Sequence, residues 1–409
     1  MQELSKRAAA PKPERLRFVL QRFLIHGSHW LVFAHLPVIL RGQGVADPRI
    51  GLVVGLFSLA SMILMLPMGV MADRFSPRRT ILSCAVVLSL YFLGLLVVRS
   101  LVPILGLVVA GGAAFAGLVV VSEALFLKLF GGEERGQRIA SFQLATYLGY
   151  GLGPLAGGLL LGVSDQAGLL FAAAALGAIL VFLVGLDMPD SPVRLPGFRE
   201  YRRDLWQPAP LLLAACVFVI GTHFGVEQTS LSLFMVQELG LGPGTVGLVF
   251  AGLGLWMAAI VPVIGRLRDR PQAPFRFVLG GLVVSGLFQT ATAWASGLAS
   301  LLVIRILHTT GDAVALLELS VLTAQFFPSA RLGGSSGLLY GVRTVATFAA
   351  ALAAGGLNRW LGYGGSFLAS GALVTFFAGL AVLVLALSDR ARAAVGWQPA
   401  PPGPRPNSP

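Results

Sequence analysis

The chain has 409 residues, of which 56% are hydrophobic and 12% are charged. Soluble domains carry about 25% charged residues, so this chain has too little charge to cover water-soluble domains of ordinary size. Its mean hydropathy of +0.81 and its 51 glycines indicate an integral membrane protein, because glycine is commoner in membrane helices than in soluble ones.

The formal net charge of +12 does not indicate a nucleic-acid partner. The basic residues are 27 arginines and 3 lysines, and they form short clusters between apolar runs rather than one continuous face. The two cysteines, Cys84 and Cys216, lie inside apolar runs and predict neither a disulfide framework nor a zinc site. The basic start lacks a small-residue cleavage site, so we expect no cleavable signal peptide.

Twelve apolar runs of the chain are near 20 residues long, which a helix needs to cross about 30 Å of hydrocarbon. We therefore predict an all-α integral membrane protein with twelve transmembrane helices in two pseudo-symmetric six-helix bundles, at 1–187 and 209–388. A polar, arginine-rich cytoplasmic linker at 188–208 joins them. A disordered cytoplasmic tail is predicted at 389–409, because six prolines follow Gly396. The predicted spans are 18–40, 50–72, 80–98, 102–127, 140–163, 168–187, 209–235, 245–264, 278–295, 299–325, 336–357 and 365–387.

The loop charges predict the orientation. If the N-terminus is cytoplasmic, 23 of the lysines and arginines fall on the cytoplasmic side, and only Arg41, Arg49, Arg99 and Arg359 fall outside. Under the positive-inside rule, this excess places both termini in the cytoplasm. We expect a multi-pass protein of a bacterial-type cytoplasmic (inner) membrane.

Two segments of the chain repeat at a constant offset of 196 residues. Parallel six-helix halves with such internal symmetry are a known transporter architecture. The matched residues are Gly51, Leu52, Val53, Gly69, Asp73 and Arg74 in the first segment and Gly247, Leu248, Val249, Gly265, Asp269 and Arg270 in the second.

The loop at 69–79 reads GVMADRFSPRR and resembles the signature G-x-x-x-D-[RK]-x-G-[RK]-[RK]-[RK] of the major facilitator superfamily. The inner glycine is replaced by Ser76 and one basic position by Pro77. These two residues predict an N-cap and a first helical position for the next span. The resemblance implies that Gly69, Asp73 and Arg74 latch the cytoplasmic side when the transporter faces outward. Gly265, Asp269 and Arg270 are their counterparts in the repeat.

The span at 140–163 carries a glycine stripe at Gly149, Gly153 and Gly157, followed by Gly158, with Pro154 inside it. The spacing i, i+4, i+8 allows close packing on a neighbouring helix. The segment also resembles the core of the superfamily's antiporter motif, which favours export, although plain close packing explains the stripe equally well.

The superfamily's arginine in the fourth span is absent, because residues 104–121 hold no charge. A proton-transfer role for that arginine therefore cannot be assigned here. Arg22 lies near the cytoplasmic end of the first span, where its side chain is expected to reach toward the interface.

Twelve ionisable residues lie within the predicted spans, where a charge costs at least about 2.5–3.5 kcal/mol. Eleven of them lie in the first, fourth, seventh and tenth spans, which line the central cavity in the resembled superfamily. The twelve are Arg22, His26, His29, His35, Glu123, His223, Glu227, Arg305, His308, Asp312, Glu318 and Arg343.

Two groups of these residues share a helix face. Arg305, His308 and Asp312 are spaced i, i+3, i+7, and His223 and Glu227 are spaced i, i+4. Burial favours the protonated form of a carboxylate, whereas a nearby cation favours its ionised form. We predict that Glu227 or Asp312 couples transport to protons or contacts the substrate. A static ion pair that only ties helices together is the alternative.

The remaining residues are secondary candidates. His26 and His29 can polarise a substrate or bind a metal, but they can equally be histidines satisfied within the helix packing. Glu123 and Glu318 lie toward the inner ends of their spans, where each can bind a proton or pair with Arg343.

These observations predict a secondary transporter that exports a small organic molecule against proton entry. The alternative is a proton-coupled symporter importing an organic anion held by Arg305 or Arg343. A transporter-like sensor is a further alternative, although no signalling domain is added. The absence of a recurring H-x-x-x-H box argues against a membrane enzyme, and no P-loop supports ATP-driven pumping. We expect no catalytic residues, no cofactor, no metal, and a monomer whose partners are its substrate, protons and the lipid bilayer.

Overall fold

The structure is a computed structural model that describes residues 12–74, 76–129, 135–185, 203–268, 275–327 and 332–397. Within these ranges the chain is helical and contains no β-strand, which confirms the predicted all-α class. By length and composition, nine helical segments of the described part are able to cross a membrane.

Each of the twelve predicted spans coincides with helical structure. The first six are α2 (Lys12–Phe33) with α3 (Leu36–Gly42), α4 (Asp47–Arg74), α5 (Pro77–Val97), α6 (Leu101–Leu129), α7 (Arg135–Val163) and α8 (Gln166–Gly185). The next four are α10 (Pro208–Leu233), α11 (Pro243–Arg268), α12 (Arg276–Ala291) and α13 (Leu298–Phe326). The last two form α14 (Leu332–Leu387), which is interrupted at Gly362, where φ is 72° and ψ is 173°.

Helix ends follow local sequence signals. The Ser76 side chain accepts a hydrogen bond from the backbone N–H of Arg79, and Pro77 begins α5, which confirms the predicted cap. α10 continues into a π-helical turn, Phe234–Glu238.

The tail predicted to be disordered from residue 389 instead begins with a short helix, α15 (Asp389–Val395). Ser388 caps this helix by accepting a hydrogen bond from the N–H of Ala391, and Gly396 ends it in the left-handed conformation. The proline content that suggested disorder belongs to the following residues, and 398–409 lie outside the described part.

The contacts group the chain into two compact units, each of which is described by itself. The first comprises Met1–Leu195, Phe224–Ala258 and Thr344–Ser366, and the second comprises Pro196–His223, Ala259–Arg343 and Phe367–Pro409. The bundles predicted at 1–187 and 209–388 stay a prediction. Of the predicted linker, only residues 203–208 are described.

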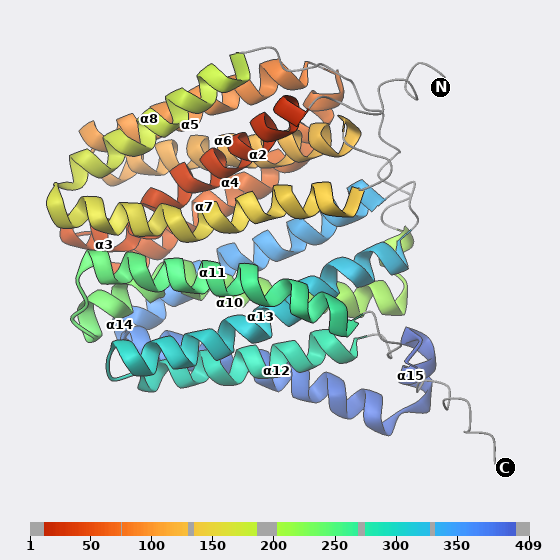
Figure 1. Cartoon of the computed structure of the whole chain (residues 1–409). Helices are drawn as coiled ribbons and strands as arrows, with labels where there is room; N and C mark the ends of the chain where they lie inside the picture. The colour runs from red at the N-terminus through yellow and green to blue at the C-terminus, as the bar shows by residue number, and fades with distance from the viewer. Residues whose placement is uncertain are drawn as a thin grey trace, which may run out of the picture. The chain divides into compact units, whose positions relative to one another are not determined.

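In the first unit, α2 packs along α7, α4 along α6, and α5 along both α6 and α8 (Figure 1). The predicted glycine stripe of α7 faces α2. A Cβ atom on Gly149 would lie 2.7 Å from the Cβ of His26, and one on Gly153 would lie 2.7 Å from the backbone oxygen of Gly27. Gly157 meets the backbone of Leu31 in the same way. The stripe therefore allows close backbone packing, as its spacing predicted.

The sequence repeat has a counterpart in the packing. Gly51 of α4 lies so close to Ala351 of α14 that a Cβ atom would overlap the Ala351 carbonyl oxygen. Its counterpart Gly247 in α11 meets α7, where a Cβ atom would lie 2.5 Å from the carbonyl oxygen of Pro154. Both glycines thus allow a helix crossing that any larger residue would obstruct.

Candidate functional site

The second unit holds the candidate site, which is built where α12 crosses α13. Gly281 and Gly311 bring the two backbones together, since a Cβ atom on Gly281 would lie 2.8 Å from the Gly311 carbonyl oxygen. This close approach places polar side chains of α12 beside Asp312 and His308 of α13. His223, at the end of the α10 segment that belongs to this unit, completes the group.

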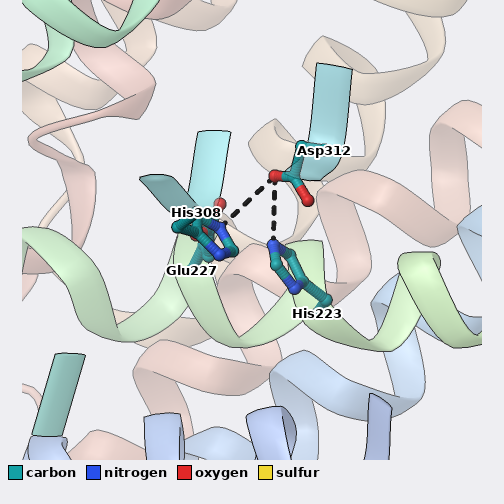
Figure 2. Close-up of side chains that lie close together, drawn as sticks. All are labelled: His223, Glu227, His308 and Asp312. Carbon is teal, nitrogen blue, oxygen red and sulfur yellow. Dashed lines mark ion pairs between the residues drawn. The ribbon is translucent and has the colours of Figure 1, made fainter. Parts of the chain in front are cut away.

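The Asp312 carboxylate is the centre of the site (Figure 2). Its Oδ2 lies 3.3 Å from Nε2 of His223 and 3.3 Å from Nε2 of His308. Its Oδ1 accepts a hydrogen bond of 2.7 Å from the Ser285 hydroxyl. The three ionisable residues are 4% exposed or less. We call them, with Ser285, the His–Asp cluster.

The two imidazoles of the His–Asp cluster are stacked. Their ring centroids are 4.4 Å apart and their planes differ by 12°. The Nδ1 atom of His308 lies 3.0 Å from the backbone carbonyl oxygen of Ser285. Ser285 therefore contacts the cluster twice, through its hydroxyl at Asp312 and through its carbonyl at His308.

The predicted face shared by His308 and Asp312 is confirmed, and Glu227 lies one turn after His223 on α10 (Figure 2). Arg305 was expected beside Asp312, but its guanidinium donates a hydrogen bond of 2.9 Å to Oε1 of Gln289 on α12. The ionisable residues that contact Asp312 are the two histidines instead. Equal spacing on one helix face did not bring Arg305 to the carboxylate, because the neighbouring helix supplied an acceptor.

Sequence reasoning missed Ser285 and Gln289. The span at 278–295 holds no ionisable residue, so a search for ionisable residues does not find it. The available signal is the pair of neutral polar residues at i, i+4, both of which are fully buried.

The residues of the His–Asp cluster also carry atoms that can act as metal ligands. One donor atom from each of His223, His308 and Asp312 lies within 4.8 Å of the others, and Glu227 is on the next turn of α10. Histidine binds a metal ion through a nitrogen lone pair, which lies in the plane of its ring. Imidazole nitrogens and a carboxylate are ligand types that bind transition metals, so the expectation of no metal stays a prediction.

A second ion pair, between a buried arginine and a partly exposed glutamate, lies in the first unit. Arg22 of α2 is 4% exposed, and its guanidinium lies 3.1 Å from the Glu123 carboxylate of α6. It also donates to the Thr146 hydroxyl at 2.8 Å and to the Val119 carbonyl at 3.2 Å. The expectation that Arg22 reaches the interface is therefore wrong, because its guanidinium pairs with Glu123. Acceptors on two neighbouring helices hold the guanidinium inside.

The histidines of the first span lie in the first unit, among aromatic rings and backbone carbonyl groups. His29 stacks on aromatic rings, including Phe57 at 4.9 Å and Phe115 at 4.1 Å between centroids. His26 meets the edge of Phe115, and His35 hydrogen-bonds the Pro154 carbonyl oxygen at 2.9 Å.

The structure gives fewer contacts for Glu318, for Arg343 and for the residues of the gating motif. Glu318 of α13 is buried, and the Arg343 guanidinium lies 3.9 Å from the Tyr340 ring centroid. The backbones of Gly69, Asp73 and Arg74 form the last turns of α4, but their side chains lie outside the described part, as do Asp269 and Arg270 entirely. Gly265 lies in α11 with open space around its Cα. The gating role of these residues stays a prediction.

Comparison with known proteins places the chain in a family. The enterobactin exporter EntS of Shigella flexneri is 26% identical over 380 residues, which cover 90% of each chain. The MFS-type transporter SLC18B1 of Homo sapiens is 28% identical over 184 residues, or 44% of this chain. That match spans only about two fifths of the relative's length, 40%.

The fold also matches a solved structure. The crystal structure of the human organic anion transporter MFSD10 (TETRAN) has a TM-score of 0.67 at 21% identity, covering 90% of this chain and 100% of that chain. The family profile described as Major Facilitator Superfamily matches residues 18–230 and 213–408. Since these ranges cover nearly the whole sequence, the chain belongs to the Major Facilitator Superfamily.

Proposed function

We propose that this chain is a proton-coupled secondary transporter that exports a small organic molecule by alternating access. Membership of the Major Facilitator Superfamily supports secondary transport across a membrane. The loop charges favour cytoplasmic termini in a bacterial-type inner membrane. The single observation that supports proton coupling is the buried His–Asp cluster. A carboxylate buried in a membrane helix is energetically costly, and such residues mark proton or substrate pathways.

Export is favoured over import by the relatives. Relatives that align over 90% of both chains carry the name of an exporter of enterobactin. The two arginines suggested for holding an imported anion have contacts within the protein: Arg305 donates to Gln289, and Arg343 lies over the Tyr340 ring. The glycine stripe of α7 does not separate the two directions, because close packing on α2 accounts for it.

The proton has a definite place in this proposal. A carbonyl oxygen only accepts hydrogen bonds, so the contact with the Ser285 carbonyl assigns a hydrogen to Nδ1 of His308. A neutral ring with that hydrogen has only an acceptor at Nε2, and Nε2 faces the Asp312 carboxylate at 3.3 Å. Two acceptors at this distance repel each other. One additional proton between them, on Nε2 or on Oδ2, removes the repulsion.

Alternating access then couples this proton to transport. The His–Asp cluster binds a proton when α10, α12 and α13 pack around it. Without that proton, His308 Nε2 and the Asp312 carboxylate are two hydrogen-bond acceptors that face each other in a buried site. When one side opens, water can hydrate the carboxylate and the imidazole separately, and the proton leaves. A transporter that accumulates its substrate needs such a difference in proton affinity between its two open states.

A single experiment separates antiport from symport. Purified protein is reconstituted in liposomes that contain a pH-sensitive dye, and candidate substrates are added outside, beginning with enterobactin and a panel of organic anions. Uptake in exchange for protons makes the lumen more alkaline, whereas symport makes it more acidic. We expect alkalinisation that depends on the protein. Lumenal acidification would contradict antiport, and substrate uptake without any pH change would contradict proton coupling.

A further inference from the structure

A second polar site lies in the first compact unit. A cavity of about 310 Å³ is lined by residues at the adjoining ends of α3 and α4 and at the interruption of α14. Its polar lining is Arg41, Asp47, Asn358, Arg359 and Tyr363. None of these residues belongs to the His–Asp cluster. The loop charges predict that this end of the helices faces outside.

Glycine packing forms this cavity. Gly355 of α14 lies against the first turn of α4, where a Cβ atom would lie 2.6 Å from the Asp47 carbonyl oxygen. Arg359 follows Gly355 by one helical turn, so the close crossing carries its guanidinium toward the start of α4. The chain then breaks at Gly362, which brings Tyr363 into the cavity wall.

The residues that line the cavity carry two positive charges and one negative charge. The Glu238 carboxylate lies beside the lining and accepts hydrogen bonds from the backbone N–H groups of Tyr363 and Gly364 at 2.7 and 3.2 Å. The Asp47 carboxylate is 3.4 Å from the Arg41 guanidinium and accepts a hydrogen bond of 3.4 Å from the Tyr363 hydroxyl. Its charge is therefore balanced within the protein. Arg359 has no ion pair or side-chain hydrogen bond among the described residues, so its charge is available to a ligand.

An unsatisfied amide adds a hydrogen-bond donor. Asn358 is 5% exposed, and its Oδ1 accepts hydrogen bonds from Ser230 at 2.9 Å and from Ser366 at 2.5 Å. Both hydroxyls orient the amide, whose Nδ2 is buried without a partner in the described structure. A buried donor without an acceptor is costly, and an acceptor on a ligand would recover that cost.

We propose that this cavity binds an oxyanion, a carboxylate or a phosphate group, between Arg359 and the Asn358 amide. A guanidinium and amide N–H groups match the acceptor oxygens of such an anion. The anion is either a free organic or inorganic anion or the headgroup of an acidic lipid. The neighbouring Trp360 is 81% exposed, which suits a position at the membrane interface. The inference does not depend on the direction of transport or on its coupling.

Binding measurements test this site. The full-length protein in phosphatidylcholine nanodiscs is titrated calorimetrically with benzoate and with inorganic phosphate. A second preparation, in nanodiscs that contain phosphatidylglycerol, is examined by native mass spectrometry for retained lipid. Saturable benzoate or phosphate binding identifies a free anion as the ligand, and retention of phosphatidylglycerol alone identifies a lipid headgroup. Either result supports the site.

Three variants and a control make the test specific. We expect Arg359→Gln to weaken binding about tenfold, because it removes a charge-assisted hydrogen bond, and Arg359→Lys to retain most of it. Asn358→Asp keeps acceptors for Ser230 and Ser366 but replaces the donor by a negative charge, so it should abolish binding. Arg99→Gln is the matched control.

Arg99 suits this control because it is also predicted to lie outside and its guanidinium donates to the Leu95 carbonyl rather than lining the cavity. Thermal unfolding confirms that each variant is folded. The proposal is overturned if the wild-type protein binds none of the three probes, or if Arg359→Gln binds as tightly as the wild type.

Discussion

Asp312 and His223 lie on different helices, α13 and α10, and are joined at 3.3 Å between carboxylate Oδ2 and imidazole Nε2. His308 approaches the same oxygen at the same distance from one turn away on α13. One buried carboxylate is thus shared by two buried imidazoles. We therefore expect a substitution at Asp312 to change proton binding more than it changes substrate binding.

The first prediction concerns Asp312→Asn. We expect this variant to lose accumulation driven by a proton gradient but to keep exchange of labelled substrate at equal pH. Exchange needs only the substrate site and the rocking motion, whereas accumulation also needs a group whose proton affinity differs between states. Both activities are measured in the same liposomes, together with thermal stability. If the site is only a structural ion pair, accumulation, exchange and stability will fall together.

Asp165→Asn is the matched control for this variant. Asp165 is exposed and caps α8 by accepting hydrogen bonds from the N–H groups of Ala167 and Gly168 at 3.0 and 3.1 Å. Asparagine caps helices about as well as aspartate, so the same chemical change there should leave both activities unchanged.

The second prediction concerns Glu227, one turn after His223 on α10. If Glu227 rather than Asp312 carries the coupled proton, Glu227→Gln should lose accumulation and keep exchange. Our assignment to the His–Asp cluster predicts instead that Glu227→Gln retains accumulation. Should both Asp312→Asn and Glu227→Gln accumulate substrate like the wild type, neither is the coupling residue, and Glu123 and Glu318 are tested next.

The third prediction concerns the glycine of the α4–α14 crossing. Gly51→Ala should destabilise the protein by about 1–3 kcal/mol, because the added methyl group overlaps the Ala351 carbonyl oxygen. Gly280→Ala is the control, since no atom lies within 4 Å of a Cβ atom placed there. Alanine at that helical position should be neutral or stabilise by about 0.5–1 kcal/mol. Equal melting temperatures for the two variants in detergent would argue against a tight crossing.

The fourth prediction concerns Arg22. Arg22→Gln should lower the free energy of unfolding by about 1–3 kcal/mol, because it removes the contacts to Glu123, Thr146 and Val119 from a buried position. This loss of stability is small for an ion pair with a buried arginine, because the Glu123 side chain is 39% exposed and can be hydrated. Denaturant titration of the purified protein measures it. A variant as stable as the wild type would show that the pair contributes nothing to the fold.

The fifth prediction concerns the loop motif after α4. Asp73→Asn should impair transport while folding and membrane insertion stay largely intact, because a latch shifts the balance between conformations by a few kcal/mol at most. Transport rates are compared at equal amounts of folded protein. Unchanged transport would count against a gating role for Asp73.

Hydropathy alone located the apolar helices, but not the short polar helix α15. The bilayer requires about 20 apolar residues per span, and that requirement is strong enough to locate all twelve runs without knowledge of their packing. The sequence repeat also predicted that Gly51 and Gly247 are equivalent, because small residues are needed where two helix backbones pack closely. Spacing on one helix likewise placed His308 beside Asp312, since the helical period determines which residues share a face.

Partners on other helices depended on the tertiary structure. Arg305 had the spacing to reach Asp312 but bonds Gln289, and Arg22 is held by Glu123 rather than by water. Ser285 meets Asp312 because Gly281 and Gly311 let α12 and α13 touch, and His223 reaches the same carboxylate from α10. Helical periodicity orders side chains along one segment, whereas the pairing between segments follows from the packing that brings donors and acceptors within about 3 Å of each other.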